Sequence, residues 1–138
     1  MGNRRLSREL ALKALFFLDI NPTDDTTDLE AFCAQNQEAL TETVKPFFLE
    51  IVQGVRNGLA TIDDQLNRYS KNWKLSRMPL VDRNIMRMAV FELLNCPDIP
   101  ASVTINEAVE IGKKYGTRDS GAFINGVLDR IKAQQGSG

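Results

Sequence analysis

Apolar side chains recur along this chain every three to four residues, the spacing of a helix that buries one face. The clearest stretch is 46–69, whose inward positions alternate in steps of four and three: Phe48, Val52, Val55, Leu59, Ile62, Leu66 and Tyr69. Sustained alternation of period two, which marks a half-buried strand, is missing from the sequence. The pattern therefore predicts an all-α fold of about six to seven helices.

Breaking and capping residues divide this pattern into six segments, which begin near Arg4, Thr27, Pro46, Leu80, Thr104 and Asp119. The segment 80–94 is apolar on nearly every side, so we expect it to form the central helix of the core. Thr104 and Glu107 have the spacing of a capping box and are expected to start the fifth helix. Gly116 is expected to end it.

Short connections favour antiparallel packing, and we expect two three-helix sub-bundles at about 1–70 and 71–135. Trp73 lies at the joint between them. The closing residues 136–138, Gly-Ser-Gly, are typical of a linker left from expression. We therefore expect a single helical domain over residues 1–135.

Several classes of function are excluded by what the sequence lacks. It contains no histidine, the commonest general base and a frequent metal ligand. Its two cysteines, Cys33 and Cys96, cannot complete a zinc site and are expected to be buried, reduced thiols. The glycine-rich phosphate-binding patterns GxGxxG and GxxxxGKS/T do not occur. The sequence thus supports neither a metal nor a nucleotide cofactor.

The composition is typical of a soluble globular protein, with 43% hydrophobic and 25% charged residues. No apolar run approaches the ~20 residues that a bilayer requires. The first residues lack the apolar core and cleavage site of a signal peptide. We therefore expect a cytoplasmic protein.

A net charge of −1 conceals a strong segregation of charge along the chain. Residues 1–18 carry four basic side chains and one acidic, whereas residues 19–50 carry one basic and eight acidic. Basic side chains are again in excess over residues 51–138. This polarity is typical of a protein that engages a partner through one basic end.

The first predicted helix places an aromatic ring beside arginines. At 100° per residue, Arg5 and Phe16 lie only about 20° apart, and Leu12 falls on the same line. Arg8 lies within about 80° of Phe16, while Phe17 belongs to the core stripe on the other side. Rings that stack on bases and guanidinium groups that hold phosphates are features of single-stranded RNA recognition. Packing of Leu12 and Phe16 on another helix explains the same pattern equally well.

A second basic cluster flanks Gly116 and contains Lys113, Lys114, Tyr115 and Arg118. Backbone N–H groups at the start of the last helix can hold a phosphate, and Tyr115 can stack on a base. A solvated C-terminal helix cap accounts for the lysines without any ligand.

Three blocks of sequence resemble a known family. They are RRLSRELALKALF at 4–16, VDRNIMRMAVFEL at 81–93, and INEAVEI, KYG and FINGVLD within 105–129. The blocks span nearly the whole chain in order, and the INEA and FINGVLD stretches are the most specific. The chain is similar to the bacterial transcription antitermination factors of the NusB family.

This resemblance implies a compact all-α protein of two three-helix bundles with no catalytic activity. Members of the family bind the boxA element of ribosomal RNA leader transcripts and pair with the small-subunit ribosomal protein that acts as Nus factor E. The pair joins RNA polymerase to suppress premature termination, and the family contains both monomers and homodimers. The alternative is a protein-recruitment module, because the fold also resembles the N-terminal domain of certain ribosomal RNA methyltransferases.

Matched residue by residue, the family's RNA contacts fall on Arg4, Arg5, Arg8, Phe16, Lys113, Tyr115, Asp119 and Phe123. The second basic cluster adds Lys114 and Arg118. The resemblance places contact with the ribosomal protein at Asp82. The family often has tyrosine in place of Phe16, and a basic residue where this chain has Gly121 and Ala122. The last difference removes one expected phosphate contact.

Three polar residues of these blocks are expected to be structural. Glu92 shares the inward face of its helix with apolar residues, so it needs an arginine or lysine partner. Arg87 is placed in the same structural group, and Asn125 is expected to fix backbone groups near a helix end. The guanidinium of Arg8 is expected to face solvent, so that Arg8→Ala leaves thermal stability almost unchanged.

Overall fold

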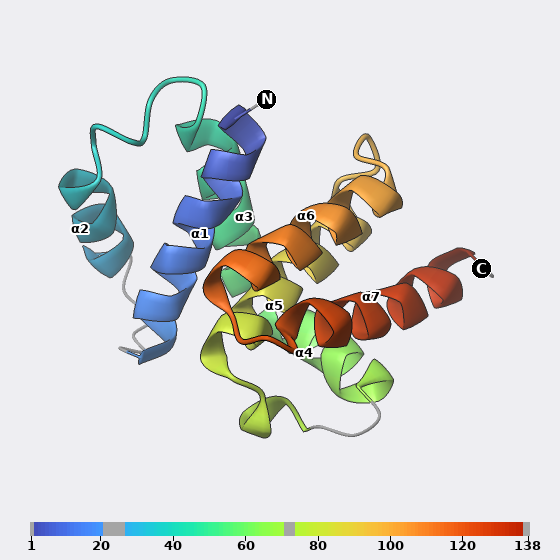
Figure 1. Ribbon diagram of the computed structural model, residues 1–138. Coiled ribbons are helices and arrows are strands. Elements are labelled where there is room, and N and C mark those ends of the chain that lie inside the picture. The colour runs from blue at the N-terminus through green and yellow to red at the C-terminus, as the bar shows by residue number, and fades with distance from the viewer. Residues whose placement is uncertain (1, 21–26, 71–73, 137–138) are drawn as a thin grey trace.

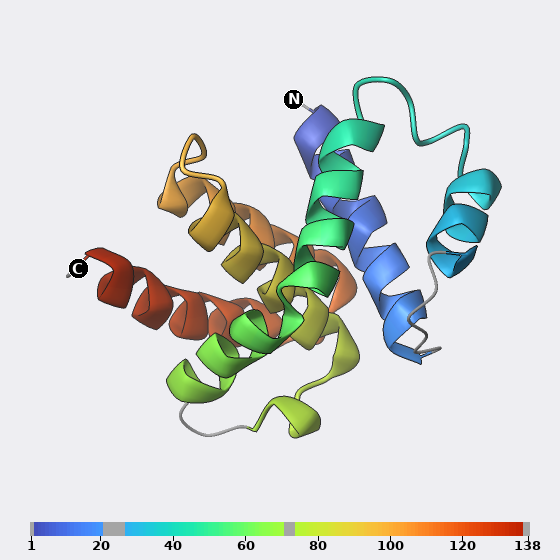
Figure 2. The ribbon, with the colours of Figure 1, turned by 180° about the vertical axis from the view of Figure 1, so that it is seen from behind.

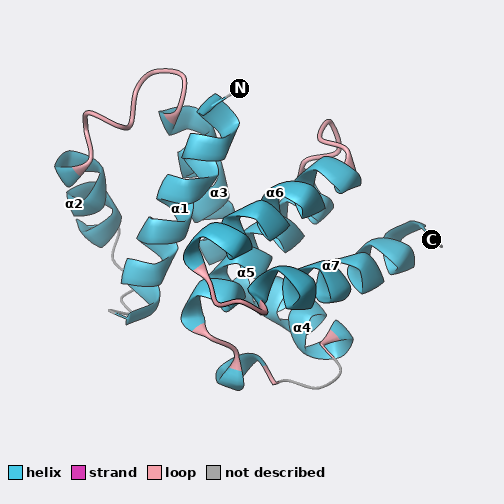
Figure 3. Ribbon diagram, viewed as in Figure 1, coloured by secondary structure: helices cyan, strands magenta, loops and turns pink. Residues whose placement is uncertain are grey.

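The computed structural model describes residues 2–20, 27–70 and 74–136. These residues form seven α-helices and one 3-10 turn, and they contain no strand (Figure 3). The elements are α1 (Gly2–Ile20), α2 (Thr27–Gln35), α3 (Lys45–Asn57), α4 (Leu59–Tyr69), η1 (Leu75–Arg77), α5 (Leu80–Asn95), α6 (Ala101–Tyr115) and α7 (Ser120–Gly136). The predicted all-α fold is confirmed, whereas Trp73 lies outside the described residues. None of these helices is long and apolar enough to cross a membrane.

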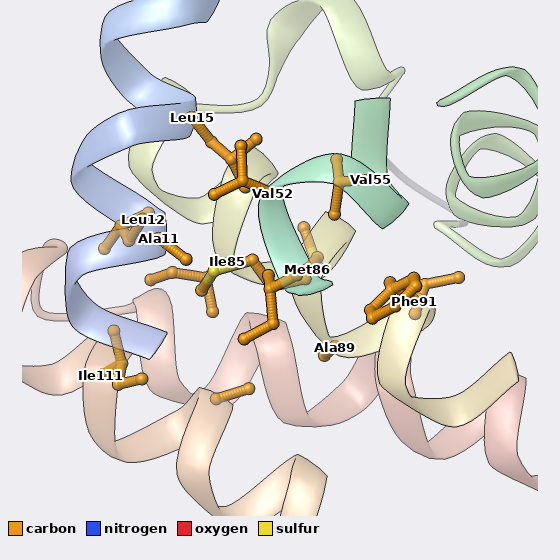
Figure 4. Packing of buried hydrophobic residues seen from close by; sticks show 14 of the residues in the cluster. Ala11, Leu12, Leu15, Val52, Val55, Ile85, Met86, Ala89, Phe91 and Ile111 are labelled. Carbon is orange, nitrogen blue, oxygen red and sulfur yellow. The ribbon is translucent and has the colours of Figure 1, made fainter. Parts of the chain in front are cut away.

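Helix α5 lies at the centre of the molecule and packs against α1, α3, α4, α6 and α7 (Figure 1). Its residues from Asn84 to Glu92 are all buried, which is why its sequence has almost no polar side. Figure 4 shows Leu15 of α1 and Val52 of α3 meeting beside Ile85 of α5. The prediction of a central core helix is confirmed.

The long helix predicted over 46–69 is two helices, because the chain bends at Gly58 (Figure 2). Gly58 has φ −105° and ψ 18°, so it leaves the helical conformation. The pair Asn57 and Gly58 is a frequent turn former, and glycine loses more conformational entropy in a helix than other residues. Leu59, expected in the core, is 39% exposed after this bend, while Ile62 and Leu66 remain buried.

The predicted capping box at Thr104 is wrong, because α6 begins one turn earlier at Ala101, directly after Pro100. Proline favours a helix start, since its fixed φ suits the first turn. Thr104 therefore lies inside the helix, and its hydroxyl donates to Glu92 of α5. The predicted end at Gly116 is confirmed, and α7 begins at Ser120 as expected.

The remaining structural expectations have mixed outcomes. Arg87 is 9% exposed and binds both carboxylate oxygens of Asp63, so its structural role is confirmed. Asn125 is exposed, and its amide donates to the Asp129 side chain instead of to the backbone, so that expectation is wrong. Cys96 is buried as predicted, and burial raises its pKa to about 11. Cys33 is only half-buried.

Candidate nucleic-acid interface

Two basic segments that lie far apart in the sequence meet on one face of the molecule. Side chains of α1 contact side chains of α6 across 102 to 106 positions of sequence. Figure 1 shows these two helices, blue and orange, next to each other. We call this surface the α1/α6 face, and its residues are Arg5, Glu9, Lys13, Glu107, Lys114 and Tyr115.

Two glutamates bind the polar groups of this face. Arg5 donates to both carboxylate oxygens of Glu107, with its Nη2 2.7 Å from Oε2. The Nζ of Lys114 lies 3.0 Å from Oε1 of Glu9, and the Tyr115 hydroxyl donates to the same oxygen at 2.7 Å. The Glu9 side chain is 11% exposed and that of Lys114 is 57% exposed. The carboxylate is therefore fixed beneath a cation that reaches into solvent.

The pairing shifts the protonation equilibria of this face. The hydrogen bond from Arg5 lowers the pKa of Glu107 below its usual value. Burial alone would raise the pKa of Glu9, but hydrogen bonds from Tyr115 and Lys114 outweigh it and lower the pKa. The bond to Glu9 raises the pKa of Lys114, while burial and then Glu9 raise the pKa of Tyr115. At neutral pH both glutamates are ionised and Tyr115 is a neutral donor.

Tyr115 supplies an aromatic ring surrounded by ammonium groups. The Nζ atoms of Lys13 and Lys114 lie 5.8 and 5.2 Å from its ring centre. On α1, the half-buried Phe16 falls between Arg5 and Glu9 in angle, since helical positions 5, 9, 13 and 16 share a sector of about 80°. The α1/α6 face thus combines rings with cations, the arrangement that unpaired bases and phosphates require.

Arg8 does not share this surface. Its side chain is 4% exposed and binds the carboxylate of Glu92, which is 2% exposed. The prediction that its guanidinium faces solvent is wrong, because α1 turns this position toward α5, where a buried carboxylate needs a cation. The prediction that Glu92 has an arginine or lysine partner is confirmed. Arg4 remains at the surface, 55% exposed and 3.7 Å from Asp98.

The buried stripe of α1 also differs from the prediction. Phe17, expected in the core, is 41% exposed, and Leu6 on the same helix is 38% exposed. Leu12, expected beside the RNA-facing residues, is 3% exposed and belongs to the core (Figure 4). The stripe centres on small residues, since Ala11 and Ala14 are both fully buried. Small side chains of this kind allow helices to approach closely, and the sequence pattern places Ala14, but not Ala11, on the buried stripe.

The other predicted contact residues lie around the junction of α6 and α7. Lys113 is 65% exposed and pairs with Glu110 on its own helix. Arg118 and Asp119 are exposed in the turn before α7, and Phe123 is half-buried in its first turn. In sequence, Lys113 precedes Tyr115 of the α1/α6 face, and the other three residues follow it.

Asp82, the predicted contact for a protein partner, is 4% exposed. Its Oδ1 accepts a hydrogen bond of 2.7 Å from the hydroxyl of Ser120. Ser120 also accepts from the backbone N–H of Thr117, so Asp82 ties the start of α7 to the start of α5. Its role in partner binding stays a prediction.

Sequence reasoning assigned no role at this face to Glu9, Lys13 or Glu107. A signal was present on α1, where Arg5, Glu9 and Lys13 alternate in charge at spacings of four residues. No such signal marked Glu107, whose spacing to Thr104 was interpreted as a capping box. Only the packing of α6 across α1 brings its carboxylate to Arg5.

The fold and this face define a class of protein: a helical binding protein with a basic, aromatic surface. Among the described residues, no group of three or more cysteine, aspartate or glutamate side chains could hold a metal ion. Comparison with known protein families identifies the family within this class. The chain belongs to the NusB family, whose model matches residues 5–133.

Relatives and solved structures agree with this membership. The chain is 58% identical over 132 residues to the transcription antitermination protein NusB of Desulforapulum autotrophicum, covering 96% of this chain and 92% of that protein. The structure of T. maritima NusB matches with a TM-score of 0.78 and 41% identity over 93% of this chain and 89% of that one. The fold is also that of a chain in the complex of antitermination factors NusB and NusE with double-stranded RNA, with a TM-score of 0.85, 21% identity and coverage of 97% and 98%.

Proposed function

We propose that this chain is a non-enzymatic antitermination factor that binds boxA-type single-stranded RNA through the α1/α6 face. The ribosomal protein that acts as Nus factor E is its partner, and the pair acts on RNA polymerase in the cytoplasm. The observation that supports this most is that α1 meets a segment about 100 residues away, where Arg5 binds Glu107 and Lys13 lies over the ring of Tyr115. Family membership supports the same function.

In this proposal the cations hold phosphates and the rings stack on bases. The phosphate-binding side chains are Arg4, Arg5, Lys13, Lys113, Lys114 and Arg118. The stacking side chains are Phe16, Tyr115 and Phe123, and Asp119 adds a polar contact at the start of α7. Arg8 acts indirectly, because its bond to Glu92 fixes the orientation of α1.

Binding of the protein to a boxA-type RNA oligonucleotide tests the proposal. If about three to five phosphates are neutralised, the logarithm of the association constant falls against that of the salt concentration with a slope of roughly −2 to −4. Adding the ribosomal protein is expected to tighten binding and to increase the preference over a scrambled RNA. Affinity that does not change with salt contradicts the proposal. A complex that forms with the ribosomal protein but never with RNA favours the alternative, a protein-recruitment module.

A further inference from the structure

Two cations of the α1/α6 face, Arg5 and Lys114, already have anionic partners within the chain. Glu107 holds Arg5, and Glu9 holds both Lys114 and the hydroxyl of Tyr115. A phosphate that reaches Lys114 therefore meets a carboxylate in the position where it would bind. The resulting competition affects both the strength and the selectivity of RNA binding.

We propose that Glu9 is a built-in counter-ion of the RNA site, which a phosphate must displace from Lys114 before that lysine engages RNA. This inference rests on the proposed function. Its basis is the contrast in exposure within the pair, 11% for Glu9 and 57% for Lys114. The lysine can swing outward to a phosphate, whereas the carboxylate stays in place between α1 and α6.

Replacement of Glu9 by a phosphate on Lys114 favours ligands that also stack a base on the protein over ligands that carry charge alone. An ion pair at a protein surface contributes little net stability, so displacing it costs little. After the exchange the carboxylate of Glu9 still lies close to the incoming phosphate and repels it. A ligand whose base also stacks on Tyr115 compensates for this repulsion, while a purely anionic ligand does not. Glu9 thus lowers affinity for all anions and raises the relative preference for stacked, single-stranded RNA.

The variant Glu9→Gln tests this role directly. Its amide oxygen can still accept from the Tyr115 hydroxyl, but the negative charge is gone. We expect RNA affinity at low salt to rise about three- to tenfold, because the phosphate at Lys114 no longer competes with a carboxylate or is repelled by it. The preference for boxA-type RNA over inorganic polyphosphate, which carries charge but no bases, is expected to fall, because charge alone then suffices for more of the binding.

Asp64→Asn is the matched control. Asp64 lies on α4, is 62% exposed and pairs with Arg68, so its replacement also removes one carboxylate and one ion pair. RNA binding by this variant is expected to equal that of the wild type, which separates a local effect of Glu9 from a change in net charge. Thermal unfolding of each variant establishes that it is folded.

If the folded Glu9→Gln variant binds RNA no more tightly than the wild type, the inference is overturned while the proposed function stands. If neither wild type nor Glu9→Gln binds RNA at low salt, the proposed function fails and the inference fails with it. Glu9→Ala provides a second test should Glu9→Gln not fold, since it removes the same negative charge beside Lys114. Tighter RNA binding by this variant supports the inference, and unchanged or weaker binding overturns it.

Discussion

Arg8 and Glu92 form an ion pair in the interior of the protein, closed by two hydrogen bonds of 2.7 and 2.9 Å. Thr104 donates to the same carboxylate at 3.1 Å, and Glu107 lies 3.5 Å from the Arg8 guanidinium. The pair therefore connects α1 to α5 and α6. Because α1 carries half of the α1/α6 face, this buried contact determines how that face is assembled.

Replacing Arg8 by alanine is expected to destabilise the protein by about 3–5 kcal/mol, because it leaves the carboxylate of Glu92 buried without a counter-charge. This reverses the expectation from sequence that the substitution is nearly neutral. Arg4→Ala, at an exposed position on the same helix, is expected to change stability by less than about 0.5 kcal/mol. Urea unfolding of both variants checks the prediction, and a loss for Arg8→Ala as small as that for Arg4→Ala contradicts it.

Stability is expected to fall in acid because Glu9 and Glu107 have lowered pKa values in the folded protein. The ordinary pKa of a glutamate is 4.5. As the pH falls below it, the unfolded chain takes up protons before the folded one, so the stability that these two glutamates contribute at neutral pH is lost. Urea unfolding at neutral pH and at about pH 3 measures the loss. The double variant Glu9→Gln, Glu107→Gln is expected to lose about 1 kcal/mol less than the wild type. If both proteins lose the same free energy of unfolding in acid, Glu9 and Glu107 are not the cause of the loss.

Gly54 is required by the close approach of α3 to α5. A Cβ atom at this position would lie 2.1 Å from a ring carbon of Phe91, whose side chain is itself buried. Gly54→Ala is therefore expected to destabilise the protein by about 1–3 kcal/mol, although alanine favours a helix. Thermal unfolding measures the effect. Gly126→Ala on α7 serves as the control and is expected to be neutral or stabilising, because a Cβ atom there would lie 3.7 Å from the end of the Arg130 side chain.

Tyr115→Ala is expected to weaken binding of single-stranded RNA by about 1–3 kcal/mol, because a stacking surface is lost. Tyr115→Phe keeps the ring and is expected to retain most of the affinity. Fluorescence anisotropy with a labelled RNA oligonucleotide measures both. If the two variants lose affinity equally, the hydroxyl and not the ring carries the contribution, and stacking on Tyr115 is refuted.

The sequence predicts most of the fold because the fold depends on local signals. Periodicity identifies the central helix at 80–94, and turn residues locate the end of α6 and the start of α7. The predictions fail where packing between helices overrides the local pattern. Ala11 is a weak apolar signal in sequence, yet it is fully buried on α1. The bend at Gly58 likewise interrupts an apolar repeat that continues on both sides.

In the candidate site, too, the sequence predicts the local features but not those that depend on packing between helices. Both basic clusters are visible in the sequence, because each is contiguous. Their meeting depends on how α6 crosses α1, which no local pattern specifies. The carboxylates of Glu9 and Glu107, which organise the meeting, are ordinary surface charges in the sequence. Arg8 belongs to the same basic cluster as Arg5, yet one is buried and the other is 38% exposed.

Mapping of backbone amide NMR shifts during titration with a boxA-type RNA oligonucleotide tests the central claim most directly. The account predicts that the shifted amides cluster at Lys13, at residues 113–119 and at the first turn of α7, with none on α4. Shifts concentrated on α4 or on α2 would contradict it.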